Sequence, residues 1–152
     1  MKYDNARTLD CPPDWTELTT QCYRSFDAPS GVNAKEANLK CGTENATLVS
    51  VHSLEENQLI TQSAMEAETV LNGRYVRHTA WVWLDQSRWD YSNWGEGEPG
   101  QGDCIFMGAV GTWRAANCWE KVNRYVCRLK TGKHRVFFVQ MLHFSDPILS
   151  MS

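Results

Sequence analysis

Six cysteines are the residues best suited to covalent chemistry in this sequence of 152 residues. An even number of cysteines in a small chain favours disulfide bonds and an oxidising compartment over buried or metal-binding thiols. Six cysteines allow fifteen pairings, and their spacing alone does not choose among them. The cysteine count therefore predicts an extracellular, secreted domain stabilised by disulfide bonds.

Other motifs that could carry chemistry do not form a recognisable catalytic site. The four histidines are His52, His78, His134 and His143, and they do not show the spacing of metal ligands. No serine or cysteine stands in a nucleophile motif. Residues 95–100 fit G-x-G-x-x-G literally, but Pro99 interrupts the motif and two glutamates would repel a pyrophosphate. We expect a protein that is not an enzyme and that has no cofactor of this kind.

Composition and net charge further limit the class of protein to which this sequence can belong. The net charge is −3, with 15 basic and 18 acidic residues, which argues against a nucleic-acid partner. A hydrophobic fraction of 42% and a charged fraction of 22% indicate one globular domain. No run approaches the roughly 18 apolar residues of a transmembrane helix. Residues 1–10 are polar and contain no apolar signal-peptide core.

The C-terminal segment differs in character from the rest of the chain. We expect an N-terminal extension over 1–10, a domain over 11–129, and a basic and apolar tail over 130–152. The tail has three interpretations: an element that packs on the domain, a segment that lies on a membrane surface, or an extension without fixed structure. The third interpretation is our default.

Two helices are expected to precede the strands and loops that position any site. Asn33 is a predicted N-cap with Glu36 at the third helical position. Ser53 and Glu56 form a predicted capping box, and that second helix is expected to run to about Glu68. Strands are expected over 47–51, 81–84, 104–107 and 125–129, and a glycine-rich loop over 93–103. This order predicts an α+β fold.

Taken in order, these segments resemble the long form of the C-type lectin-like domain family. Cys11-Pro-Pro-Asp-Trp followed by Cys22 is similar to the family's N-terminal hairpin. Residues 48–57 resemble the entry to its second helix, and the sequence WVWLDQSRWDYSNW at 81–94 resembles its tryptophan-rich segment. Glu98-Pro99 stands where the family has Glu-Pro-Asn. The resemblance covers residues 11–129 and implies two helices that flank small antiparallel sheets, with a long loop region.

The family pattern implies disulfide pairing and a role for the tryptophans. It implies the pairs Cys11–Cys22, Cys41–Cys127 and Cys104–Cys118. Of the seven tryptophans, we expect Trp81, Trp83, Trp94 and Trp113 to pack beneath the loops, and Trp89 and Trp119 to be exposed. The family's Trp-Ile-Gly-Leu strand is replaced by residues 70–73, with three residues apparently missing, which predicts an altered local core.

Most calcium ligands of the family's sugar site are replaced in this chain. Glu98 and Pro99 match, but Gly100 replaces the expected asparagine and the second glutamate falls at Gly102. Arg114-Ala115 replaces the Asn-Asp pair that should follow Trp113. Because Ca²⁺ takes 6–8 oxygen ligands, we expect a degenerate site in which only Glu98 and Asp103 are weak metal ligands. No cofactor is expected, and bound calcium is doubtful.

The resemblance implies an extracellular recognition module whose ligand is a glycan or an extracellular protein. The leading interpretation is carbohydrate binding, and the alternative is calcium-independent binding of a protein or another non-sugar surface. The ligand-binding loop residues expected to act in recognition are Glu98, Pro99, Asp103, Trp113, Arg114 and Asn117. Asn45-Ala-Thr is a predicted N-glycosylation site.

Overall fold

The computed structural model describes residues 11–130. The expected extension 1–10 and the tail from residue 131 onward lie outside the described residues. The elements in chain order are β1 (Thr16–Leu18), β2 (Gln21–Val32), α2 (Ala34–Gly42), β3 (Ala46–Leu48), α3 (Leu54–Ser63), β4 (Thr69–Val76), β5 (Ala80–Trp83), β6 (Cys104–Met107), β7 (Trp113–Ala116) and β8 (Val122–Leu129). The predicted α+β order is confirmed. Of the four strands with predicted bounds, β6 matches and β3, β5 and β8 differ by one to three residues at their ends, whereas no bounds were predicted for β1, β2, β4 and β7.

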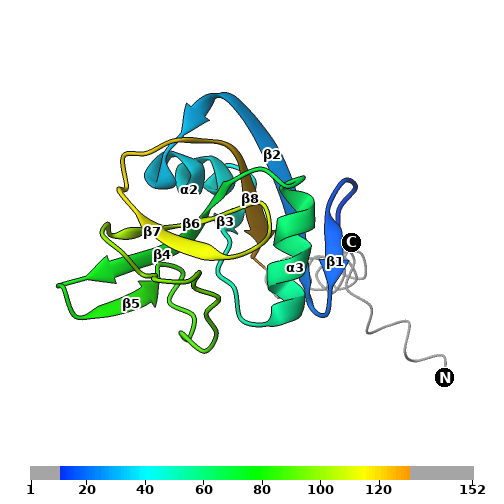
Figure 1. Ribbon diagram of the computed structural model, residues 1–152. Coiled ribbons are helices and arrows are strands. Elements are labelled where there is room, and N and C mark those ends of the chain that lie inside the picture. Colours follow the sequence, from blue (N-terminus) through cyan, green and yellow to red (C-terminus); the bar gives the residue numbers. More distant parts are fainter. Residues whose placement is uncertain (1–10, 131–152) are drawn as a thin grey trace, which may run out of the picture.

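The strands form one continuous sheet in the order β1-β2-β8-β4-β6-β7, with β3 paired to β8 and β5 paired to β4. Neighbours are antiparallel except β4 and β8, which are parallel where Val70 lies opposite Tyr125. Figure 1 shows the β4–β5 hairpin, in green, extending from the lower left of the molecule. The hairpin and the loop that follows it therefore lie away from the first strands of the sheet.

Side chains on the two faces of the sheet build two hydrophobic clusters. Consecutive strand residues alternate between them, as expected for a pleated backbone. Val70 belongs to the cluster that contains Ala37 and Cys41 of α2. Leu71 belongs to the cluster that contains Ile60 of α3. Each helix is thus fixed to the sheet by burial of its apolar face.

Both helix starts follow the capping chemistry that the sequence predicts, with one difference. The Glu36 N–H donates to Asn33 Oδ1 (2.9 Å) and the Asn33 N–H donates to Glu36 Oε1 (3.0 Å). The Glu56 N–H donates to the Ser53 hydroxyl oxygen (3.1 Å). The Glu56 carboxylate, however, accepts the His52 N–H (2.6 Å) in place of that of Ser53. The same carboxylate also accepts a hydrogen bond from the hydroxyl of Tyr23, which is buried in the core.

The second helix is shorter than expected. It ends at Ser63, whereas the apolar spacing predicted an end near Glu68. Met65 and Glu66 adopt left-handed backbone angles, with φ of 56° and 62°. These angles cannot continue a right-handed helix, so the apolar stripe beyond Ser63 belongs to a turn.

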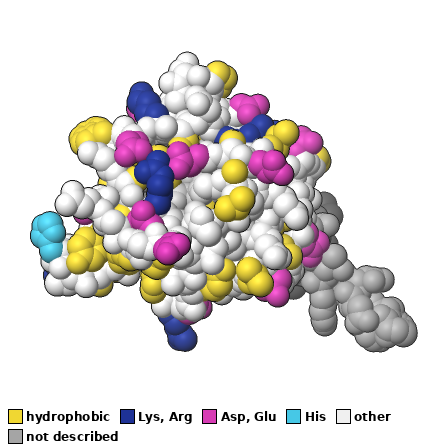
Figure 2. Space-filling model, in the orientation of Figure 1, with side chains coloured by type: hydrophobic (Ala, Val, Ile, Leu, Met, Phe, Trp, Pro, Cys, Tyr) yellow, Lys and Arg dark blue, Asp and Glu magenta, His cyan; other side chains and the backbone are white. Residues whose placement is uncertain are grey.

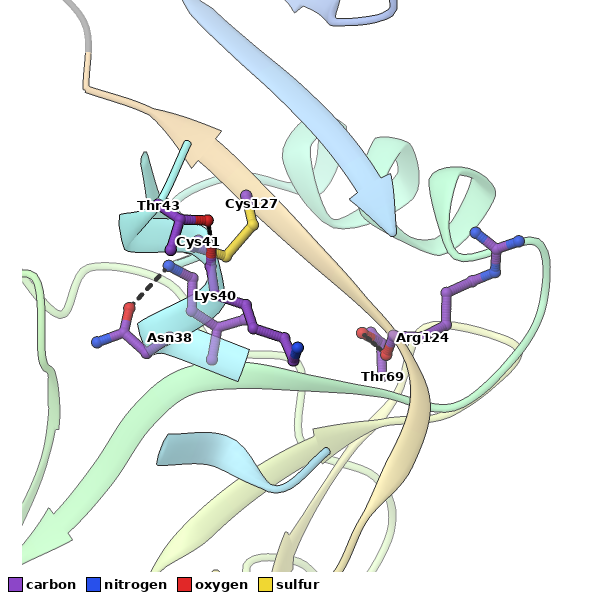
Figure 3. Close-up of a disulfide and its surroundings, with 8 residues drawn as sticks. Asn38, Lys40, Cys41, Thr43, Thr69, Arg124 and Cys127 are labelled. Carbon is purple, nitrogen blue, oxygen red and sulfur yellow. Dashed lines mark hydrogen bonds between the residues drawn. A yellow bond between two sulfur atoms is a disulfide. The ribbon is translucent and has the colours of Figure 1, made fainter. Parts of the chain in front are cut away.

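The three disulfide bonds implied by the family pattern are present. They join Cys11 to Cys22, Cys41 to Cys127, and Cys104 to Cys118. Figure 3 shows the second bond, which ties α2 to β8 across 86 positions of the chain. Closure of so large a loop contributes about 4–5 kcal/mol in the chain-entropy model. All six cysteines are paired.

Residues 70–73, which stand in place of the family's Trp-Ile-Gly-Leu strand, lie in β4. Val70 and Leu71 are fully buried, one on each face of the sheet. Gly73 lies against Ile105, and a Cβ at this position would come within 2.4 Å of the isoleucine Cδ1 atom. The side chains around this part of β4 are therefore closely packed, and the strand pairs with β5, β6 and β8.

Candidate functional site

The long loop over 84–103 connects β5 to β6 and carries three of the six predicted ligand-binding residues. A cluster of aromatic rings lies beneath it. Trp113 of β7 is 1% exposed, and the rings of Trp83, Trp89, Tyr91 and Trp94 pack around it with centroid separations of 5.7–6.0 Å. This arrangement confirms Trp83 and Trp113 as core residues and makes Trp113 a support for the loop. Its expected contact with a ligand is excluded by its burial.

Trp89 also differs from its predicted exposed position. Its ring stacks on Trp83 at a centroid distance of 4.6 Å, and the residue is half-buried. The loop turns back toward the sheet at this point, and a large apolar ring is more stable when it packs on the cluster. Trp119 is 79% exposed, as expected.

The side-chain amide of Asn57, a buried residue of α3, also holds the aromatic cluster in place. Asn57 Oδ1 accepts the indole N–H of Trp113 (2.8 Å), and Asn57 Nδ2 donates to the Gly111 carbonyl (2.9 Å). Asn93 Nδ2 donates to the same carbonyl (2.7 Å). The turn between β6 and β7, the long loop and α3 are thereby fixed to one another.

A cavity of about 520 Å³ opens between the β4–β5 hairpin and the end of the long loop. Its lining residues are Tyr75, His78, Trp81, Pro99, Gly100, Gln101, Gly102 and Asp103. Trp81 packs between Tyr75 and Trp94, each at a centroid distance of 5.1 Å. The cavity therefore combines two aromatic rings with imidazole, amide and carboxylate groups. We refer to it as the long-loop cavity.

Glu98 lies beside this cavity, and its carboxylate is engaged by the backbone. Glu98 Oε1 accepts the N–H groups of Ala115 (2.9 Å) and Gly100 (2.7 Å), and these bonds together with the nearby positive charge of Arg114 lower the pKa of the glutamate. The peptide bond between Glu98 and Pro99 is cis. The carboxylate thus stabilises the loop against β7.

Arg114 places a positive charge near Glu98. Its guanidinium pairs with Glu68 (2.9 Å) and Glu120 (3.2 Å) and lies over the Phe106 ring at 5.0 Å. Figure 2 shows acidic and basic side chains interspersed over one face of the molecule, with hydrophobic side chains among them. The two ion pairs of Arg114 hold its positive charge close to Glu98.

Within residues 11–130, no cluster of three or more His, Cys, Asp or Glu side chains has the geometry of a metal site. Gly102 cannot be replaced by the family's glutamate without displacement of the backbone. It has a φ of 120°, and a Cβ there would lie 2.4 Å from the backbone carbonyl of Ala116.

The structure brings some predicted site residues together and separates others. Pro99 and Asp103 line the long-loop cavity, and Glu98 and Arg114 lie next to it. Asn117 is exposed after β7, where its side-chain oxygen accepts the Trp119 N–H (2.8 Å). Sequence reasoning missed Tyr75, His78 and Trp81 as cavity residues, because nothing local indicates that the hairpin reaches the loop.

A polar network that sequence reasoning did not identify anchors the beginning of the long loop. The Ser50 hydroxyl oxygen lies 3.0 Å from His52 Nε2, and His52 Nδ1 lies 2.7 Å from Asp90 Oδ1. This is the Ser-His-Asp order of a hydrolase triad. Ser50, however, is fully buried and donates to Asp85 (2.6 Å), so no substrate can reach it. The spacing Ser-x-His is the only local signal, and the network is structural.

The comparisons with known proteins agree with this fold and loop. A family profile described as "Lectin C-type domain" matches residues 30–129. This chain belongs to that family. The human low affinity immunoglobulin epsilon Fc receptor is 35% identical over 127 residues, which cover 80% of this chain and 39% of the relative. The chain spans less than half the length of the curated relatives that it matches.

Two solved structures that resemble this lectin domain are described by different functions. The C-type carbohydrate-recognition domain of cow CD23, determined with the oligosaccharide GlcNAc2Man3, has a TM-score of 0.73 and 28% identity, covering 80% of this chain and 96% of its own. A calcium-independent type II antifreeze protein has a TM-score of 0.72 and 25% identity, covering 80% and 95%. The shared fold therefore serves different ligands. No helix over residues 11–130 has the length and apolar character needed to cross a membrane.

Proposed function

We propose that this lectin domain is an extracellular recognition module that binds carbohydrate in the long-loop cavity without calcium. The observation that supports it best is the composition of that cavity. Tyr75 and Trp81 line the cavity and supply aromatic surface against which the C–H groups of a sugar can pack. Gln101 and Asp103 are exposed and can hydrogen-bond sugar hydroxyls. A concave site with aromatic walls and a few polar groups is typical of small-ligand recognition.

Calcium independence is supported by the chemistry around Glu98. The family's metal would need several anionic oxygens free to bind it, whereas here the Arg114 guanidinium lies near Glu98 and occupies the carboxylates of Glu68 and Glu120. Sugar hydroxyls that would complete a calcium shell must here bind protein groups directly. The six paired cysteines support an oxidising, extracellular location. Asn45 is exposed, as an N-glycosylated side chain must be.

A second candidate function is recognition of a protein. Trp119 is 79% exposed, and one similar protein is named as a receptor for an immunoglobulin Fc region. Binding to a non-sugar surface is a third outcome, since a similar structure is that of a calcium-independent antifreeze protein.

Binding to a glycan array in calcium and in EDTA tests the proposal. We expect glycan binding to persist in EDTA and to weaken at least about tenfold in Gln101→Ala and Asp103→Ala, which remove exposed cavity groups. Glu96→Ala, an exposed change in the same loop, is the control and should bind like the wild type. Binding that disappears in EDTA, or no glycan binding at all, would refute this function. A thermal hysteresis assay then tests the surface-binding outcome.

Calorimetric titration with millimolar Ca²⁺ provides an independent test of the missing metal site. The wild type should give no binding heat. The triple variant Gly100→Asn, Arg114→Asn, Ala115→Asp restores three oxygen ligands. Gly100 has room for a side chain, since the atom nearest to a Cβ there would be Glu98 Oε1 at 3.5 Å, an ordinary van der Waals contact. Gain of calcium affinity in this variant, with none in the wild type, is the expected result. Heat from the wild type itself would contradict it.

A further inference from the structure

A second cavity of about 310 Å³ lies on the other side of β4 from the long-loop cavity. It is enclosed by the start of α2, by β4 and by the turn after β7. Its lining residues are Asn33, Ala34, Lys35, Asn38, Leu39, Asn72, Arg74, Leu84, Cys118 and Trp119. Arg74 and Tyr75 are neighbours in β4, so their side chains point to opposite faces of the strand. We refer to this second cavity as the Arg74 cavity.

Arg74 contributes a hydrogen-bond donor that nothing in the described structure satisfies. Its Nε atom is buried and has no partner over residues 11–130. Over the same residues, the ion pairs involve neither Arg74 nor Lys35, so no carboxylate there neutralises the two cations that line the cavity. A buried donor without a partner is costly and rare in folded proteins. The Nε atom itself is covered by the protein, but Arg74 lines the cavity and no ion pair among the described residues neutralises its guanidinium, so an anionic group in the cavity would pair with that charge.

The rim of the Arg74 cavity is apolar and exposed. Trp119 is 79% exposed, Leu39 is 63% exposed and Leu84 is 42% exposed. Tryptophan and arginine are enriched among the residues that dominate protein–protein binding energy, particularly where they surround a desolvated pocket. Two leucines on the rim favour an apolar side chain over sugar hydroxyls as the neighbouring group.

We propose that the Arg74 cavity is a docking site for a partner protein that inserts a glutamate or aspartate side chain flanked by an apolar residue. The inserted carboxylate accepts from the Arg74 guanidinium and pairs with Lys35, and the apolar residue packs on Trp119 and the leucines. Charge-assisted bonds from a planar guanidinium give both strength and orientation. The site is separate from the long-loop cavity and does not depend on carbohydrate binding there.

Titration of the ¹⁵N-labelled full chain with two capped peptides tests this assignment. The probes are acetyl-Leu-Glu-Leu-amide and its neutral counterpart acetyl-Leu-Gln-Leu-amide. The acidic peptide should produce saturable NMR shifts over 33–39, 72–74 and 118–119, and the neutral peptide should bind at least about tenfold more weakly. Equal binding of both peptides, or no shifts from either at millimolar concentration, would overturn the proposal.

Three variants separate recognition from a structural role. Arg74→Met should weaken the acidic peptide at least about tenfold while the melting temperature stays the same or rises, because the unpaired buried donor is removed. Trp119→Ala should also weaken the peptide and leave the fold intact. Arg88→Met, which changes an exposed arginine outside the cavity, is the matched control. A lower melting temperature of Arg74→Met with unchanged binding would make Arg74 structural. Binding of glucuronate at these residues in place of the peptide would assign the cavity to acidic carbohydrate.

Discussion

Arg114 places a positive charge near Glu98, where a metal ion would lie in a calcium-binding member of the family. Its ion pairs with Glu68 and Glu120 are half-exposed, so each contributes little to stability on its own. Their effect is to hold one guanidinium beside Glu98, whose lowered pKa keeps the carboxylate charged. The Glu98 carboxylate is thereby held by two backbone N–H groups and lies near an arginine.

Gly102 provides the sharpest test at the scale of one residue. Gly102→Ala combines a strained positive φ with a Cβ that lies 2.4 Å from the Ala116 backbone. We expect a loss of about 3 kcal/mol in the free energy of unfolding, measured by urea denaturation. Gly97→Ala is the matched control, since Gly97 has a φ of 78° but open space around it, and should cost about 1 kcal/mol. Equal losses would mean that contact with β7 does not restrict this position.

At the scale of elements, the features that could be predicted are those determined by residues close together in the sequence. The capping residues Asn33 and Ser53 act within one helical turn, so both helix starts could be predicted. The end of α3 could not, because left-handed angles at Met65 and Glu66 are not encoded by apolar spacing. Glu56 likewise depends on Tyr23, which lies 33 positions away.

The candidate site was predicted only in part for the same reason. Glu98, Pro99 and Asp103 were found because they lie close together in the sequence, at and after the family's Glu-Pro motif. Tyr75 and Trp81 come from the β4–β5 hairpin, and only the paired strands bring them to that loop. The buried position of Trp113 reflects its hydrogen bond to Asn57, 56 positions earlier.

The packing of the long loop on the rest of the domain depends on Trp89. Trp89→Ala removes a half-buried ring that stacks on Trp83, and we expect it to destabilise the fold by about 2–3 kcal/mol and to expose the loop to proteolysis. Urea denaturation and limited proteolysis of the loop over 84–103 measure the two effects. Trp119→Ala is the control, because that ring is exposed and its loss should change stability by about 0.5 kcal/mol or less. Similar results for the two variants would contradict the assignment of Trp89 to the aromatic cluster.

The molecule as a whole is held together by contacts between distant parts of the chain. The Cys41–Cys127 bond joins α2 to β8, and the Asp85–Arg128 ion pair joins the start of the long loop to the same strand. Asp85 also accepts from Ser50, which precedes α3. One carboxylate therefore links three regions, and its charge state should affect the stability of the entire domain.

The pH dependence of stability tests this link. Burial opposes ionisation of Asp85, but hydrogen bonds from Ser50 and Ser87 and the charge of Arg128 outweigh it, so the pKa of Asp85 is lowered in the folded protein. An unfolded aspartate has a pKa near 3.9. Stability due to the carboxylate is therefore fully present above about pH 4 and is lost as pH falls through the lower folded value.

Asp85→Asn should reduce the free energy of unfolding by about 3 kcal/mol at neutral pH, since the mostly buried Arg128 loses its partner. That difference from the wild type should shrink as pH falls below about 4, because protonation of Asp85 then removes the same charge from the wild type. Urea denaturation from pH 7 down to acid measures it. Asp27→Asn removes an exposed aspartate paired with Arg124 and should cost about 0.5 kcal/mol or less. A difference for Asp85→Asn that stayed constant down to strongly acidic pH would show that the carboxylate stabilises the domain through its hydrogen bonds and shape, and that its charge is not responsible.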